Sequence, residues 1–175
     1  MMTRDLPTAT RMASFEQVAL GEIPVLYRVA RRLTRNNDDA EDLVGTTLYQ
    51  GAKAWERFDG RHARAWLIRI LRNAHLGEIR RQTSRPEETL GTEIDSSYEG
   101  FWKVIDWRLA GGRVMEELDK LPEDFRLAVA LVDVEEMGHA EAADALGIPE
   151  ATLRTRLFRG RKRLRASLAH LGEGL

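Results

Sequence analysis

The chain has 175 residues, 43% of them hydrophobic, which is enough to bury one core or two small ones without covalent staples. It contains no cysteine, which excludes a disulfide framework, a thiolate metal site and a cysteine nucleophile. The formal net charge is −1, no segment approaches the roughly 20 apolar residues that span a bilayer, and no signal-peptide pattern is present, so we expect a cytoplasmic protein without membrane insertion.

The N-terminal residues carry the first helix signal. Residues 1–13 show no periodicity and are predicted to form a disordered arm. A helix is expected from Ser14, whose side chain can cap it with Gln17 as the capping-box partner. Apolar residues then recur at helical spacing as far as Leu33, and Pro24 is expected to kink or divide this helix.

Two further helices are expected in the first half. Asp38 or Asp39 is predicted to cap a second helix that runs through Trp55. The turn at residues 58–61 ends it, and a third helix is expected over about residues 63–82. No alternating strand pattern occurs in this half of the sequence.

Residues 86–112 lose the helical periodicity. They contain Pro86, several glycines and an acidic run, and are predicted to form a flexible linker. Phe101, Trp102 and Trp107 are unusually apolar for such a segment. They indicate either a stretch that packs on a domain or binds a partner, or a short core helix.

Helical periodicity returns at Arg113, and residues 113–170 are predicted to form a second domain, followed by a C-terminal tail, 171–175. Pro122 is expected at the first position of a helix, where its missing N–H is not needed. The helices expected in this domain span about residues 114–121, 122–134, 138–146 and 149–168.

Charge is segregated along the chain. Residues 61–85 carry seven arginines against one acid, and residues 151–175 carry seven basic residues against one acid. Residues 86–112 and 112–150 are acidic. Binding to a polyanion depends on local neutralisation of phosphates, so two basic blocks remain compatible with DNA binding at a net charge near zero.

The most specific local pattern is a helix-turn-helix. A short helix is expected to end at Gly147, where a left-handed turn has no steric cost, and Pro149 starts the next helix. Small residues allow the two helices to cross closely. These small residues are Ala142 and Ala143, and the buried seam is expected to contain Ile148, Leu153 and Leu157.

The outward face of the last helix is basic. The N-terminal part of a recognition helix enters the major groove, where arginine can contact guanine with two hydrogen bonds. We therefore assign Arg154 and Thr155 to base edges, and Arg156, Arg159 and Lys162 mainly to phosphates. The alternative is a solvated basic helix end that the helix dipole favours.

The basic helix of the first half has a less specific pattern. It combines arginines with stacking and hydrogen-bonding groups, as single-stranded or opened DNA requires. A solvent-exposed charged face over an ordinary tryptophan core explains the same residue types equally well. The residues concerned are His62, Arg64, Trp66, Arg69, Arg72, Asn73, Arg80 and Arg81.

Four motifs in order carry a family resemblance. They are Asp39-Ala-Glu-Asp-Leu-Val, Ala65-Trp-Leu-Ile-Arg-Ile-Leu-Arg-Asn, Leu118-Asp-Lys-Leu-Pro-Glu-Asp-Phe-Arg and Gly147-Ile-Pro-Glu-Ala-Thr-Leu-Arg-Thr-Arg-Leu. With them, residues from about 14 to 170 resemble the extracytoplasmic-function (ECF) sigma factors of the sigma-70 superfamily. Four ordered motifs arise by chance far less readily than one helix-turn-helix.

The resemblance implies an all-α protein of two small helical domains joined by a flexible linker, the C-terminal one a helix-turn-helix. Residues 14–85 would form sigma domain 2, which binds core RNA polymerase and recognises and melts the −10 element. Residues 113–170 would form sigma domain 4, which recognises the −35 element. The implied partners are the polymerase clamp, promoter DNA in double-stranded and melted form, and an anti-sigma factor.

The resemblance also implies site residues by position. The polymerase clamp would contact Asp39, Glu41, Asp42 and Thr46. The −10 element, with one base flipped out at a cost of about a few kcal/mol, would contact Asp59, Arg61, His62, Arg64, Trp66, Arg69, Arg72 and Asn73. The −35 element would contact Thr152, Arg154, Thr155, Arg156, Phe158, Arg159 and Lys162.

The chain departs from the family pattern at two places. Gly45-Thr46 stands where Gln-Glu is usual, which removes a polar contact group and adds a helix-weakening glycine, and Gly138-His139 stands where Ser-Tyr is usual. No phosphate-binding glycine loop, nucleophile motif or histidine cluster occurs, so we expect no enzyme, no cofactor, no metal and no small-molecule substrate. The alternatives are a stand-alone helix-turn-helix regulator and a protein-interaction module that uses the acidic blocks and the linker tryptophans.

Overall fold

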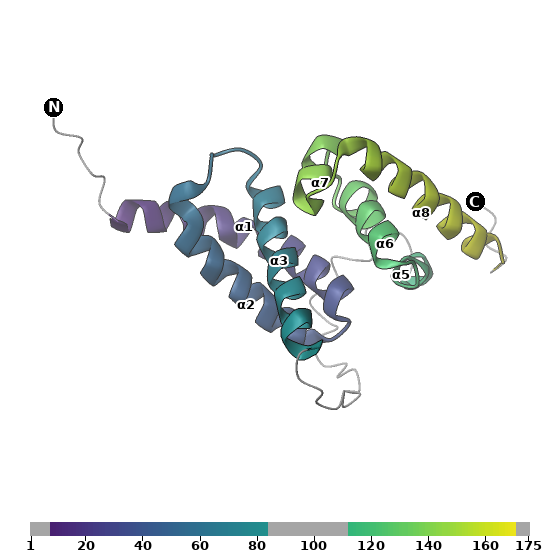
Figure 1. Ribbon diagram of the computed structural model, residues 1–175, viewed down its shortest axis with the longest axis horizontal. Helices are drawn as coiled ribbons and strands as arrows, with labels where there is room; N and C mark the ends of the chain where they lie inside the picture. The colour runs from purple at the N-terminus through teal and green to yellow at the C-terminus, as the bar shows by residue number, and fades with distance from the viewer. Residues whose placement is uncertain (1–7, 84–111, 171–175) are drawn as a thin grey trace.

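The computed structural model describes residues 8–83 and 112–170, and every regular element in these ranges is a helix (Figure 1). No strand occurs among these residues, which confirms the all-α prediction. The first half contains α1 (Thr8–Thr34), α2 (Asn37–Ala54), a short 3-10 turn (Trp55–Arg57) and α3 (Ala63–Thr83). The second half contains α5 (Gly112–Asp119), α6 (Glu123–Val129), a π-helical turn (Ala130–Val134), α7 (His139–Leu146) and α8 (Glu150–His170).

α1 is longer than the sequence predicted. It begins at Thr8 and runs unbroken to Thr34, so Ser14 lies inside the helix, and the expected cap there is wrong. Phe15 is buried, and packing of an apolar side in the core supplies most of the stability of such a helix. Pro24 lies within the helix without dividing it. Residues 1–7 of the predicted arm lie outside the described residues.

The start of α2 shows how its capping residue was misassigned. The side chain of Asn36, rather than that of Asp38 or Asp39, is the cap: it accepts hydrogen bonds from the backbone amides of Asp38 and Asp39, at 2.8 and 3.2 Å. Asp38 and Asp39 occupy the first turn of the helix, where carboxylates stabilise the positive end of the dipole. Their carboxylates therefore remain exposed on the surface.

α1, α2 and α3 pack together into a three-helix bundle. Its centre is formed by Leu26, Leu67, Ile68 and Leu71, which are all fully buried. Burying a leucine or isoleucine side chain contributes about 1.5–3 kcal/mol, so these residues fix how α3 sits on the other two helices. One end of the bundle is closed by four aromatic rings in mutual contact, Phe15, Trp55, Phe58 and Trp66.

The second half is built around α6 and α8. The carbonyl of Pro122 accepts hydrogen bonds from the amides of Phe125 and Arg126. Pro122 is therefore the N-cap of α6 and not, as the sequence predicted, its first helical residue. The buried guanidinium of Arg126 donates to the carbonyls of Asp119 and Leu121 and so satisfies the end of α5. Burial lowers the pKa of Arg126 below its ordinary value. Gly160 lets α8 lie directly on α6, because a Cβ there would stand 2.8 Å from Cγ2 of Val129.

The helix-turn-helix has the predicted geometry. α7 ends at Gly147, whose left-handed conformation (φ 64°) lets its amide bond back to the helix. α8 starts directly after Pro149, and Leu153 and Leu157 are buried between the two helices. Ala142 and Ala143 are also buried, as predicted, while Ile148 is partly buried.

The two halves are in contact. α3 packs against α7, and α1 touches α6, so buried residues from both halves belong to one continuous hydrophobic cluster (Figure 1). The predicted flexible linker, with Phe101, Trp102 and Trp107, lies outside the described residues. Among the helices described, none is both long and apolar enough to cross a bilayer.

Candidate nucleic-acid and polymerase interfaces

The outward face of α8 exposes the residues predicted to bind the −35 element. Leu153 and Leu157 hold the inner side of the helix in the core. Exposed side chains on the other side are Arg154, Thr155, Phe158, Arg159 and Lys162, whereas Thr152 and Arg156 are half-buried. The exposed fraction of Phe158 is 68%, so this face presents an apolar ring among its basic side chains.

The basic side chains of α8 differ in what they contact. Arg156 pairs with Asp124 at 3.2 Å, and Arg161 pairs with Asp133 at 2.7 Å. The hydrogen bond to Asp133 raises the pKa of Arg161 above its ordinary value. Within the described residues, Arg159 and Lys162 form no ion pair, so their charges are available to phosphates.

Arg154 is held by a neighbour on its own helix. Its guanidinium pairs with Glu150 one turn earlier, at 2.6 Å. Both side chains are exposed, so the pair is worth little in water and can give way to a base edge. A hollow of about 520 Å³ lies beside it, lined by Arg154, Phe158, Lys162 and His139 among others. His139, which replaces the usual tyrosine, therefore borders the predicted DNA-binding face.

The predicted −10 residues divide into two groups. The first group lies at the turn before α3 and on its exposed face, where Asp59, Arg61, His62 and Asn73 are all exposed. Asp59 accepts the backbone amide of Arg61 at 2.9 Å and fixes the turn, and Gly60 and His62 have left-handed φ angles of 81° and 50°. A non-glycine residue in that conformation is uncommon and often marks a functional turn.

Trp66 is placed between the core and the surface. It is half-buried, with ring contacts to Trp55 and Phe58 at centroid distances of 6.0 and 4.9 Å. The ring therefore forms part of the aromatic end of the bundle, as the alternative interpretation of the sequence held. Phe58, which contacts the Trp66 ring, directly precedes Asp59 in the chain.

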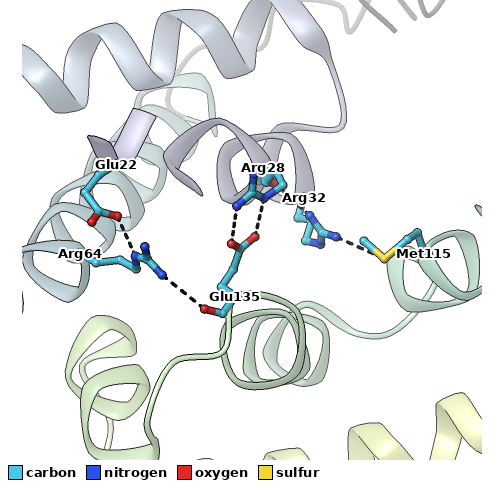
Figure 2. Close-up of polar contacts among 6 residues, drawn as sticks. All are labelled: Glu22, Arg28, Arg32, Arg64, Met115 and Glu135. Carbon is cyan, nitrogen blue, oxygen red and sulfur yellow. Dashed lines mark hydrogen bonds and ion pairs between the residues drawn. The ribbon is translucent and has the colours of Figure 1, made fainter. Parts of the chain in front are cut away.

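The second −10 group faces the other half of the molecule. Arg69 donates to the backbone carbonyl and the carboxylate of Asp144, at 2.8 and 2.6 Å. Arg72 donates to the carbonyl of Leu146 at 2.8 Å. Arg64 pairs with Glu22 at 2.7 Å and also donates to the carbonyl of Glu135 (Figure 2). Sequence reasoning could not find these contacts, because they join residues far apart in the chain.

The predicted polymerase-binding residues lie on the exposed side of α2. Asp39, Glu41, Asp42 and Thr46 are all exposed. Three of them, together with side chains of α3, line a groove of about 530 Å³ between the two helices. A partner that fits this groove would meet carboxylates on one wall and the apolar side chain of Ile79 on the other.

Sequence reasoning missed the α3 wall of this groove and one residue of α2. His75, Glu78 and Ile79 line the groove, and burial lowers the pKa of His75 while Glu123 opposes that shift. Tyr49 is 64% exposed on α2, with Lys53 over its ring at 4.7 Å. The sequence feature that could have marked Tyr49 is its position, as an aromatic residue one helical turn after Gly45-Thr46.

No cluster of three or more His, Asp or Glu side chains that could hold a metal ion occurs among the residues described here. The described residues thus form three candidate surfaces: the basic face of α8, the turn at residues 59–62 near Trp66, and the acidic groove between α2 and α3. All three suit macromolecular partners.

Comparison with known families identifies the family to which each half of the chain is related. Residues 22–85 match the family model described as Sigma-70 region 2, and residues 112–164 match Sigma-70, region 4. SigM of Mycobacterium tuberculosis, an ECF RNA polymerase sigma factor, is 31% identical over 93% of this chain and 81% of the relative. This chain belongs to the ECF sigma factors. Sigma factors direct RNA polymerase to promoters, so the family membership assigns the chain to transcription initiation.

Other relatives agree. The ECF sigma factor EcfG of Rhodopseudomonas palustris is 33% identical over 85% of the chain and 82% of the relative. SigE of Mycolicibacterium smegmatis is 33% identical over 90% of the chain, which spans 63% of that relative's length. The sigma factor RpoE of Bartonella quintana, solved with the anti-sigma factor NepR, superposes with a TM-score of 0.70 at 28% identity, covering 89% of this chain and 97% of that one.

Proposed function

We propose that this sigma factor binds the clamp of core RNA polymerase through the exposed side of α2 and recognises the two promoter elements through the turn before α3 and through α8. The observation that carries the proposal is that the residues at the family's contact positions on α2, and most of those on α8, are exposed, while apolar residues on the inner sides of the two helices are buried. The proposed role is regulatory, includes no catalytic step, cofactor or metal, and requires the cytoplasm, where polymerase and promoters are.

Recognition of the −35 element is proposed for α8. Arg154 and Thr155 lie in its first two turns, where a recognition helix meets base edges. Arg159 and Lys162 lie further along, with charges suited to phosphates. Thr152 and Phe158 would complete the face, and Arg156 would have to exchange its partner Asp124 for DNA.

Recognition of the melted −10 element is proposed for the turn at residues 59–62 together with Trp66 and the α3 residues Asn73, Arg64, Arg69 and Arg72. The exposed members can receive an unstacked base as the structure stands. The three arginines of α3 must first leave their present partners. This requirement distinguishes the −10 residues from those of α8.

An anti-sigma factor is proposed as a further partner. RpoE of Bartonella quintana was solved in complex with the anti-sigma factor NepR, and CnrH, with a TM-score of 0.66 and 26% identity, in complex with the cytosolic domain of CnrY. The acidic groove between α2 and α3 is a candidate site, because it includes the proposed clamp residues. An inhibitor there would compete with the polymerase.

The test is a pull-down with core RNA polymerase followed by run-off transcription from a library of genomic fragments. The intact chain should be retained and should produce new, sequence-specific transcription starts. Asp42→Lys should abolish retention, because it reverses a charge in the groove, whereas Glu16→Lys, an equally exposed acid on α1, should not. DNA binding without retention or new starts would support a stand-alone regulator instead.

A further inference from the structure

The hollow beside α8 has one wall from each helix of the helix-turn-helix. On the side of α7 it is lined by His139, the first residue of that helix, which is exposed. On the side of α8 the lining side chains recur every three or four residues, so they lie on one face of the helix. They are Arg154, Leu157, Phe158, Arg161, Lys162 and Arg165. His139 therefore lies beside residues proposed to bind the −35 element.

The lining of this hollow is positively charged and includes an apolar ring. Arg154 and Arg161 are each paired with an acid that does not line the hollow. Lys162 and Arg165 have no ion pair within the described part of the chain. Phe158 exposes its ring among these cations. The ligand that fits such a lining is an anion with an apolar portion, which describes the phosphates and sugars of a DNA strand.

The arrangement of the two helices places His139 where such a strand would pass. In a helix-turn-helix the second helix enters the major groove, while the first helix crosses the sugar–phosphate backbone. α7 is that first helix, and its start borders the exposed face of α8. The other end of α7, at Asp144 and Leu146, contacts α3 instead. His139 is thus at the end of α7 that adjoins the proposed DNA-binding face.

No acid of the protein already holds the imidazole of His139. The acids on α7 and on the elements packed against it are either paired with arginines or form no ion pair with this histidine. The paired ones are Asp133, Glu135, Asp144 and Glu150, and the others are Glu136 and Glu141. The cations of α3, Arg69 and Arg72, reach the other end of α7. A phosphate at His139 would therefore compete with no ion pair formed by the described residues.

We infer that protonated His139 binds a backbone phosphate of the −35 element, so that the affinity for DNA rises as the pH falls through the range of about pH 8 to 5 in which histidine gains its charge. The inference rests on the proposed −35 role of α8 and adds a contact from α7 to it. A protonated imidazole donates from both ring nitrogens, and a hydrogen bond from a cation to a phosphate is stronger than a neutral one. The tyrosine that is usual at this position gains no charge in that range, so the pH dependence belongs to the histidine.

The test measures how tightly the full chain binds a fluorescent DNA duplex of random sequence at about pH 7.5 and about pH 5.5, on either side of the histidine transition. Random sequence is suitable because a phosphate contact strengthens binding to every sequence. His139→Asn removes the charge, and His139→Lys makes it permanent. His75→Asn is the matched control, because His75 lines the acidic groove instead. Circular dichroism at both pH values checks that each variant keeps its helices.

The parent should bind about threefold more tightly at the lower pH, as expected for one exposed ion pair. Its slope of log Kobs against log salt should be steeper there by about 0.9, because one more phosphate is neutralised. His139→Asn should keep the weaker affinity and the shallower slope at both pH values. His139→Lys should show the tighter affinity and the steeper slope at both, and His75→Asn should match the parent.

The outcomes separate the inference from the function on which it rests. The same pH dependence in His139→Asn as in the parent would overturn the inference and leave the −35 role of α8 intact. A tighter affinity at low pH with an unchanged salt slope would also overturn it, because no additional phosphate is then neutralised. Failure of the parent to bind duplex DNA at either pH would instead refute the −35 role itself. If His139→Asn loses its helices, a pH dependence that persists in His139→Lys decides against the inference.

Discussion

The two basic helices of this sigma factor, α3 and α8, have similar charge but differ in what surrounds that charge. On α3, Arg69 and Arg72 donate to the end of α7. On α8, Arg159 and Lys162 are exposed and have no ion pair among the residues described. Arginine-rich composition therefore indicates which helices can bind DNA but not whether they are available to do so. Availability depends on long-range packing.

The two helices also differ in how closely they pack on the side that faces away from their basic side chains. The back of α8 lies so close to α6 that a Cβ at Gly160 would stand 3.2 Å from the carbonyl oxygen of Phe125 as well as near Val129. The glycine of α3, Gly77, has nothing within 4 Å of the same position. Close packing on α6 thus fixes the position of α8, while its basic side stays exposed.

The largest effect on stability is expected when the close packing of α8 on α6 is disturbed. Gly160→Val should lower the free energy of unfolding by about 3 kcal/mol, because neither the backbone of α6 nor Val129 can retreat far. Gly77→Val, the same change in α3, should cost almost nothing. Urea denaturation followed by circular dichroism measures both. Equal losses in the two variants would contradict the close packing of α6 and α8.

Base reading by α8 should have the next largest effect. Arg154→Ala should reduce discrimination at one base pair of the −35 element by about 1–3 kcal/mol, because arginine can form two hydrogen bonds to guanine. Arg163→Ala is the control, since Arg163 stacks on Phe125 away from the hollow. Binding to a set of single-base-pair variants of the preferred duplex measures this. A uniform loss on all sequences would assign Arg154 to phosphate contact.

The salt dependence of DNA binding should distinguish an arginine of α8 that has no ion pair from one that is paired with an aspartate. Arg159→Ala should reduce the slope of log Kobs against log salt by about 1, because one phosphate contact is lost. Arg161→Ala should change the slope less, because Arg161 is already paired with Asp133. Fluorescence anisotropy at several salt concentrations gives both slopes. A larger change for Arg161 would show that DNA displaces Asp133.

Local features of the fold were predictable from the sequence. The order of the helices, the turn at Gly147 and the buried seam of the helix-turn-helix follow from periodicity, glycine and proline. Asn36 was missed as a cap because Asp38 and Asp39 offer equally good local chemistry. The start of α1 was missed because Ser14 and Gln17 offer a capping-box pattern inside a helix that begins at Thr8.

The candidate sites were only partly predictable, for a physical reason. Exposure of Arg154 and burial of Leu153 follow from helical spacing around the turn. The contact of Glu135 with Arg28 does not, because it joins residues 107 positions apart and depends on how two domains meet. Nothing local marks one glutamate of the pair Glu135-Glu136 as buried and the other as exposed.

α2 also has one side with free space and one side that is closely packed, and substitutions there should change stability less. Gly45→Ala should raise the free energy of unfolding by about 0.5–1 kcal/mol, since nothing lies within 4 Å of the added Cβ and alanine favours the helix. Gly51→Ala should bring no such gain, because its Cβ would stand 3.2 Å from Leu67 and Phe15. Urea denaturation distinguishes the two. A gain at Gly51 equal to that at Gly45 would mean that α2 and α3 are less tightly packed.

The smallest effect is a pH dependence that α3 should show because it carries a partly buried histidine. Burial lowers the pKa of His75 in the folded state, so as the pH falls the unfolded chain takes up a proton before the folded chain does. This contribution to stability is complete above the ordinary histidine pKa and is lost as the pH falls through and below it. His75→Asn should therefore lose less stability than the parent between about pH 7.5 and 5.5.

His139→Asn is the control for that measurement, because His139 is exposed at the start of α7. It should retain the pH dependence of the parent. Glu123 opposes the effect of burial at His75, so Glu123→Gln should steepen the dependence by removing the charge that favours protonated His75. A parent whose stability is independent of pH in this range, or a steeper dependence in His75→Asn, would show that burial does not lower the pKa of His75 in solution.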